Sequence, residues 1–111
     1  MAQAALPTYD MTARKLASSL EDVADRLGRA TNAVEFVAAL DDNRAVWERL
    51  RSAARRYGWH VPSRLMDFAV ASSARARAGL SDHDVEAMIS INRSTSTTIL
   101  ADDLAEVMRP H

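Results

Sequence analysis

Apolar side chains recur at steps of three and four residues along most of this chain, which is the period of one face of an α-helix. No stretch alternates apolar and polar residues in the way a half-buried strand does. Turn residues interrupt the helical pattern at 28–32, 58–62 and 79–81. Connections this short join helices that are antiparallel neighbours. The sequence therefore predicts an all-α fold, a small bundle of about four helices.

Capping residues predict where the second helix begins and ends. Asn32 followed by Glu35 has the spacing of a capping box, in which each side chain bonds an amide of the first turn. Gly58 suits a left-handed C-cap. We therefore expect a helix from Ala33 to about Tyr57, with Asn43 as the one polar residue in its apolar stripe.

Similar signals predict the last two helices. Pro62 suits the first turn of a helix over about 63–78, because its missing N–H is not needed there. Ser81 opens the final helix. The hydroxyl-rich segment Ser94–Thr98 lowers helix propensity, so this helix either frays there or continues to about Pro110.

The chain length suits one domain with a single core, since it has 111 residues. The first helix becomes regular from about Thr12, with Ser18 or Ser19 as an alternative start. We expect the following parts: a flexible N-terminal tail at 1–10, one helical domain at 11–108 and a C-terminal tail at 109–111.

Composition excludes several classes of function. The formal net charge of -1 gives no overall attraction to nucleic acid or to an anionic membrane. The chain has no cysteine, so disulfides and thiolate metal sites are excluded. No apolar run approaches the roughly 20 residues that span a bilayer, and Met1–Met11 lacks the pattern of a secretory signal. We expect a soluble, cytoplasmic protein that does not enter membranes.

Catalytic constellations are not visible in the sequence. His60, His83 and His111 are far apart. His83 stands between Asp82 and Asp84, but neighbouring helical residues point about 100° apart and do not converge on one metal ion. We expect no enzyme activity, no bound metal and no cofactor.

Arginine is concentrated in the middle of the chain. Eight arginines lie between Arg44 and Arg77, against only two acids. This window is either a solvated face or a surface for RNA or an acidic protein. Candidate partner-binding residues are Arg51, Arg55 and Trp59. Trp59 is either a lid over the end of the bundle or an exposed contact.

Two Asn-Arg pairs occupy corresponding places in the second and fourth helices. Asn43 lies one turn from Trp47, and both should point inward. Asn92 lies on the apolar side of the last helix, so we expect the two helices to meet at these asparagines. Arg44 and Arg93, which follow the two asparagines, should lie at the edge of this helix contact with their charged ends in water. The interpretation is a polar pair that fixes register in the core. The alternative is the border of a groove for a partner helix.

The chain resembles the FlaF family of flagellar regulators from alphaproteobacteria. The segments that carry the resemblance are, in order, Tyr9, Leu20-Glu21, Asp42–Trp47, Val61-Pro62 with Arg64-Leu65, Ile89–Arg93 and Ile99-Leu100. The chain departs from the family pattern at Ser18-Ser19, where Pro-Arg is usual, at Val46 in place of leucine, and at Gly58–His60. These departures are those of a divergent member.

The resemblance implies a non-enzymatic helical protein that is needed for flagellin production and filament assembly. Such proteins act after transcription, beside a second regulator called FlbT, and bind flagellin before export in a chaperone-like way. We expect this chain to bind flagellin or a flagellin-linked regulator by accepting a helix in a groove. The alternative is an RNA-binding regulator of flagellin message that uses the arginines of the second and third helices. The oligomeric state is left open.

Overall fold

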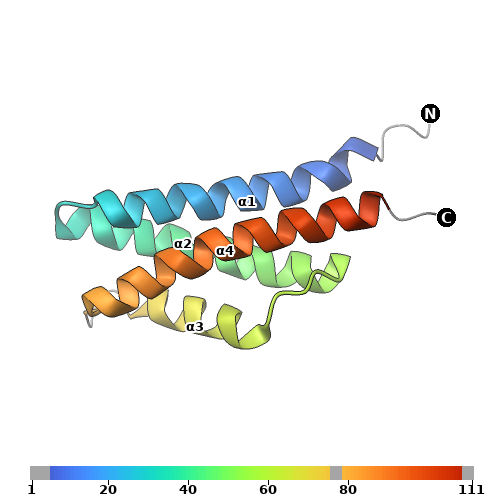
Figure 1. Cartoon of the computed structure of the whole chain (residues 1–111). Coiled ribbons are helices and arrows are strands. Elements are labelled where there is room, and N and C mark those ends of the chain that lie inside the picture. The colour runs from blue at the N-terminus through green and yellow to red at the C-terminus, as the bar shows by residue number, and fades with distance from the viewer. Residues whose placement is uncertain (1–5, 76–78, 109–111) are drawn as a thin grey trace.

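A computed structural model describes residues 6–75 and 79–108. It confirms the all-α prediction, and its helices are α1 (Leu6–Arg29), α2 (Ala33–Tyr57), α3 (Ser63–Ala74) and α4 (Asp82–Val107). α1 packs against α2 and α4, and α3 packs against the same two helices, so α2 and α4 face each other diagonally across the bundle. Successive helices run in opposite directions along an elongated body of 49 × 25 × 18 Å (Figure 1).

Helix α3 is the short member of the bundle. It has 12 residues, whereas the other helices have 24 to 26. At about 1.5 Å per residue, α3 spans only about half the length of its neighbours. The connector 58–62 continues along the bundle beyond α3 (Figure 1). The backbone N–H of His60 in this connector donates to Asp102 Oδ2 on α4 at 2.7 Å, and the side chain of the neighbouring Trp59 is buried in the core. The connector thereby covers part of the core that α3 is too short to reach.

The predicted bounds of α2 are confirmed. Asn32 Oδ1 accepts a hydrogen bond from the Glu35 backbone N–H at 2.9 Å. The return bond differs by one residue from the capping-box prediction, because Glu35 Oε1 accepts from the Thr31 N–H at 2.9 Å. At the other end, Gly58 adopts φ 72°, ψ 29° and its N–H donates to the Ala54 carbonyl. This left-handed conformation favours glycine, which lacks a Cβ.

Two predicted boundaries differ from the structure. α1 begins at Leu6, so residues 6–10 are helical and their assignment to a tail is wrong. Pro7 is accepted because a first-turn residue has no use for an amide hydrogen. α3 ends at Ala74, earlier than predicted. The remainder of the predicted tails, 1–5 and 109–111, and the segment 76–78 lie outside the described residues.

Helix α4 is continuous through Ser94–Thr98, which decides between the two sequence alternatives. The Thr97 hydroxyl donates to the Arg93 carbonyl at 3.3 Å, and the Thr98 hydroxyl donates to the Ser94 carbonyl at 3.0 Å. Hydroxyls that bond back to the preceding turn lower helix propensity but are compatible with a helix packed against neighbours. The helix begins as predicted, with Ser81 Oγ accepting from the Asp84 N–H at 3.1 Å.

The core runs along the bundle axis and draws on every helix. Trp47 is the largest of its fully enclosed side chains. The buried apolar residues with the largest side chains are Leu16, Leu20, Val23, Leu27, Leu40, Val46, Trp47, Leu50, Trp59, Met66, Met88 and Ile99. Phe36 and Tyr57, near the two ends of α2, are partly buried and pack against this core.

Candidate functional site

The two asparagines of the Asn-Arg pairs lie inside the bundle and bond to each other. Asn92 Nδ2 donates to Asn43 Oδ1 at 2.7 Å, and both side chains are 0% exposed. Trp47 Nε1 donates to Asn92 Oδ1 at 2.8 Å. The prediction that α2 and α4 meet at these residues is confirmed. They meet across the diagonal, because the polar side chains are long enough to bridge helices whose backbones are not adjacent.

The same hydrogen bonds extend to the other two helices. Asn92 Nδ2 also donates to the Leu20 carbonyl of α1 at 3.2 Å. Asn43 Nδ2 donates to Ser73 Oγ of α3 at 2.9 Å, and that hydroxyl donates to the Ala69 carbonyl at 2.6 Å. We call Leu20, Asn43, Trp47, Ser73 and Asn92 the buried polar network. A single connected network touches all four helices at one level of the bundle.

This network is suited to fixing structure and has no titratable member. Each amide would cost about 1–3 kcal/mol if it were buried without partners, and sliding one helix by a turn would break several bonds at once. The geometry therefore favours the register interpretation of Asn43 and Asn92. Neither asparagine lines a groove among the described residues, because both are fully enclosed.

The arginines that follow the two asparagines lie at the surface, as predicted. Arg93 donates to Glu21 Oε1 at 2.8 Å and to Asp25 Oδ1 at 2.9 Å, and so joins α4 to α1. The hydrogen bond to Asp25 has the largest effect on the pKa of Arg93, followed by the bond to Glu21, and together they hold it above its ordinary value. Arg44 forms a weaker pair with Glu48 within α2, at 3.7 Å. Exposed pairs of this kind contribute little to stability.

The three candidate partner-binding residues do not come together. Arg51 pairs with Asp67 of α3 at 2.8 Å. Arg55 is exposed on α2. Trp59 is 7% exposed and packs on the Tyr57 ring with centroids 5.4 Å apart. It therefore covers the end of the bundle and is not an exposed contact. Its Nε1 is buried and has no hydrogen-bond partner among the described residues.

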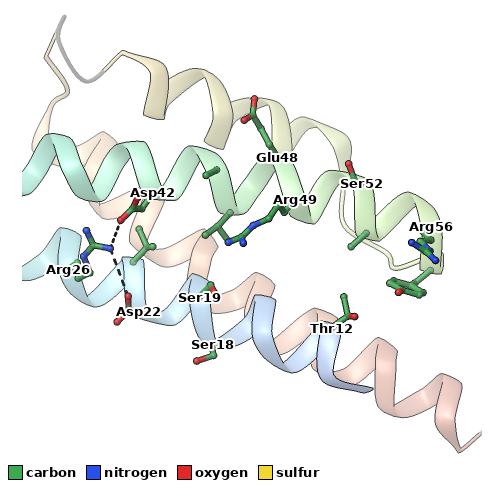
Figure 2. Close-up of a pocket in the computed structure, with 15 residues that line it drawn as sticks. Thr12, Ser18, Ser19, Asp22, Arg26, Asp42, Glu48, Arg49, Ser52 and Arg56 are labelled. Atoms are coloured by element: carbon green, nitrogen blue, oxygen red, sulfur yellow. Dashed lines mark hydrogen bonds and ion pairs between the residues drawn. The ribbon is translucent and has the colours of Figure 1, made fainter. Parts of the chain in front are cut away.

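A surface feature that the sequence did not reveal is an open groove between α1 and α2, with a volume of about 1090 Å³. Figure 2 shows Arg49 extending from α2 toward α1, close to Ser19. At one end of the groove, Arg26 bonds Asp42 at 2.7 Å and approaches Asp22 at 4.0 Å (Figure 2). A smaller adjoining hollow of about 520 Å³ is lined by Arg14, Lys15, Ser18, Ser19 and Arg49.

The predicted arginine window is therefore split between different faces. Arg49 and Arg56 line the groove beside α1, whereas Arg51 turns to α3. Lys15 and Arg14, which lie outside that window, join Arg49 from α1. Sequence reasoning missed this grouping because nothing in the primary structure links a cation on α1 to one on α2.

Within 6–75 and 79–108, no three or more His, Asp or Glu side chains gather as metal ligands do. None of the described helices is both long and apolar enough to cross a membrane. Comparison of the chain with protein-family models, curated proteins and solved structures finds no significant match.

Proposed function

We propose that this chain is a FlaF-like helical module that binds flagellin, or a flagellin-linked regulator such as FlbT, in the cytoplasm. In this proposal it acts after transcription on flagellin synthesis and assembly. Its role is chaperone-like, and it catalyses no reaction. The partner contributes a helix that lies in a groove on the outside of the bundle.

One observation carries the proposal. Two of the segments that carry the family resemblance are separated by about half the chain, yet they lie together in the structure. Asn43 and Trp47 from the first segment bond to Asn92 from the closing segment. Residues that form one structural signature of a family are expected to meet in the fold. Their contact supports the view that the ordered segments are one structural signature.

The experiment is a binding assay between the purified chain and monomeric flagellin. The chain is immobilised, its helicity is checked by circular dichroism, and flagellin is passed over it beside an unrelated acidic protein of similar size. The proposal predicts saturable retention of flagellin and none of the control. Failure to retain either flagellin or FlbT, when FlbT is passed over the folded chain in a second run, contradicts it.

RNA binding is the second candidate, and the exposed arginines of α2 favour it. Arg49, Arg55 and Arg56 are all solvent-exposed. Phosphate contacts make binding steeply dependent on salt, with log affinity falling linearly against log salt. RNA affinity that falls steeply between about 50 and 200 mM salt would favour this candidate, whereas flat or absent binding would exclude it.

A further inference from the structure

The groove between α1 and α2 has a cationic stretch that the chain does not neutralise. Arg14, Lys15 and Arg49 are exposed and form no ion pair within the described residues, whereas Arg26, Arg51 and Arg93 are paired with acids. Arg49 lines the large groove and the smaller hollow beside it. Unpaired cations that share one hollow repel each other, so an anionic group placed among them would be stabilised.

The rest of the groove has a different character. Its wall includes Val23 and Val46, which belong to the buried core, and the partly buried Ala53. The far end carries Asp22 and Asp42, of which Asp42 is bonded to Arg26 (Figure 2). From Arg49 toward Asp42, the groove thus passes from unpaired cations over Val46 to two acids that share Arg26. This gradient gives a bound chain a preferred direction.

We propose that this groove binds an amphipathic helix of a protein partner, with the carboxylates of the helix against Arg14, Lys15 and Arg49. The proposal rests on the proposed function in taking that partner to be flagellin or its regulator. Apolar side chains of the helix lie over Val46 and Ala53, but Val46 is only 4% exposed, so the carboxylates on the cations supply most of the affinity. The same charges fix the direction of the helix, because the acids Asp22 and Asp42 lie on the other side of Val46.

The length of the groove sets the length of the ligand. Its lining on α1 runs from Thr12 to Arg26. At about 1.5 Å per residue this is about 21 Å, which corresponds to a ligand helix of about 14 residues. A nucleic acid fits less well, because its uniform negative charge would meet Asp22 and Asp42 at the far end.

The test uses a labelled helical peptide of about 14 residues built from Leu, Ala and Glu, with its glutamates at one end, and a twin in which Lys replaces Glu. Arg49→Glu reverses the charge in the groove. Arg64→Glu, at an exposed arginine of α3 outside the groove, is the matched control. Circular dichroism confirms that both variants are folded. Binding is measured by fluorescence anisotropy at low and at high salt.

The proposal predicts that the unmodified chain binds the acidic peptide and not its lysine twin. Arg49→Glu should weaken acidic-peptide binding by about tenfold or more and raise binding of the twin, while Arg64→Glu changes neither by more than about twofold. Equal binding of both peptides, or equal loss in both variants, overturns it. Single-stranded poly-uridine that binds in place of the peptide and is lost in Arg49→Glu assigns the groove to RNA and also overturns it.

A parallel titration with flagellin separates this inference from the proposed function. If flagellin binds and Arg49→Glu leaves that binding unchanged, the groove is the wrong surface and the function stands. If flagellin does not bind but the acidic peptide does, with the Arg49 dependence above, the groove inference stands and the flagellin partner is wrong.

Discussion

At the scale of single residues, Asn92 is the side chain on which most of the buried network depends. Its amide bonds Trp47, Asn43 and the Leu20 carbonyl, which belong to two other helices. Replacing Asn92 with leucine keeps the approximate size but leaves Trp47 Nε1 and Asn43 Oδ1 buried without a hydrogen-bond partner. We expect a loss of roughly 3 kcal/mol or more in the free energy of unfolding, measured by urea denaturation.

The exposed N-cap Asn32 provides a control for that measurement. Asn32→Ala removes a single capping bond at the surface and should cost about 1 kcal/mol. A cost for Asn92→Leu no larger than that for Asn32→Ala would contradict the role assigned to the buried network.

The two tryptophans give a second comparison at this scale. Trp47 Nε1 donates to Asn92, whereas Trp59 Nε1 has no partner among the described residues. Both changes to phenylalanine shrink a buried ring, but only Trp47→Phe removes a hydrogen bond. We expect Trp47→Phe to be the more destabilising by about 1 kcal/mol or more in thermal unfolding. Equal losses would show that the hydrogen bond contributes nothing.

At the scale of helices, the start of α2 is sensitive to pH. The Thr31 backbone N–H, followed by the Thr31 hydroxyl, holds the pKa of Glu35 below its ordinary value. A carboxyl with a lowered folded-state pKa stabilises the fold above its unfolded pKa, and this contribution is lost as pH falls through the folded pKa. We expect the Thr31 amide to exchange faster with solvent below about pH 4, relative to intrinsic rates. In the Glu35→Gln variant, the exchange protection of the Thr31 amide should not change with pH over this range. If the variant loses as much protection as the unmodified chain, the Glu35 carboxylate is not the cause.

The helix ends also give glycine a testable role. Gly58 has φ 72° and caps α2, whereas Gly28 lies inside α1 with only Ile89 Cδ1 near its missing Cβ, at 3.8 Å. Gly58→Ala should cost about 1–2 kcal/mol, because the left-handed conformation strains any Cβ. Gly28→Ala should be neutral or stabilise by up to about 1 kcal/mol. We therefore expect the melting temperature to fall in Gly58→Ala and to stay the same or rise in Gly28→Ala. Equal falls in both variants would contradict the special role of Gly58.

Much of the helical organisation could be predicted because it is encoded locally. Asn32 and Gly58 define α2 through bonds within a few residues, and an asparagine in an apolar stripe indicates a buried partner. α1 begins earlier than the predicted Thr12, because Pro7 is compatible with the first turn of a helix. The groove could not be predicted, since Lys15 and Arg49 come together only after α1 packs on α2.

At the scale of the whole molecule, the inside and the outside of the bundle have separate roles. The buried network links all four helices and fixes their register, so it holds α1 and α2 at the spacing that forms the groove. Asn43→Leu should therefore reduce stability more than it reduces the intrinsic affinity for a partner. If that variant were equally stable but lost binding, Asn43 would belong to a binding site.

The most direct test of the account is a titration of the isotopically labelled chain with unlabelled monomeric flagellin, followed through backbone amide signals in NMR spectra. We expect that signals from the groove, including those of Ser19 and Arg49, shift or broaden at low flagellin ratios. Signals from the buried network should change little. A spectrum that stays unchanged in excess flagellin, or one that changes only along α3, would contradict binding of flagellin in the groove between α1 and α2.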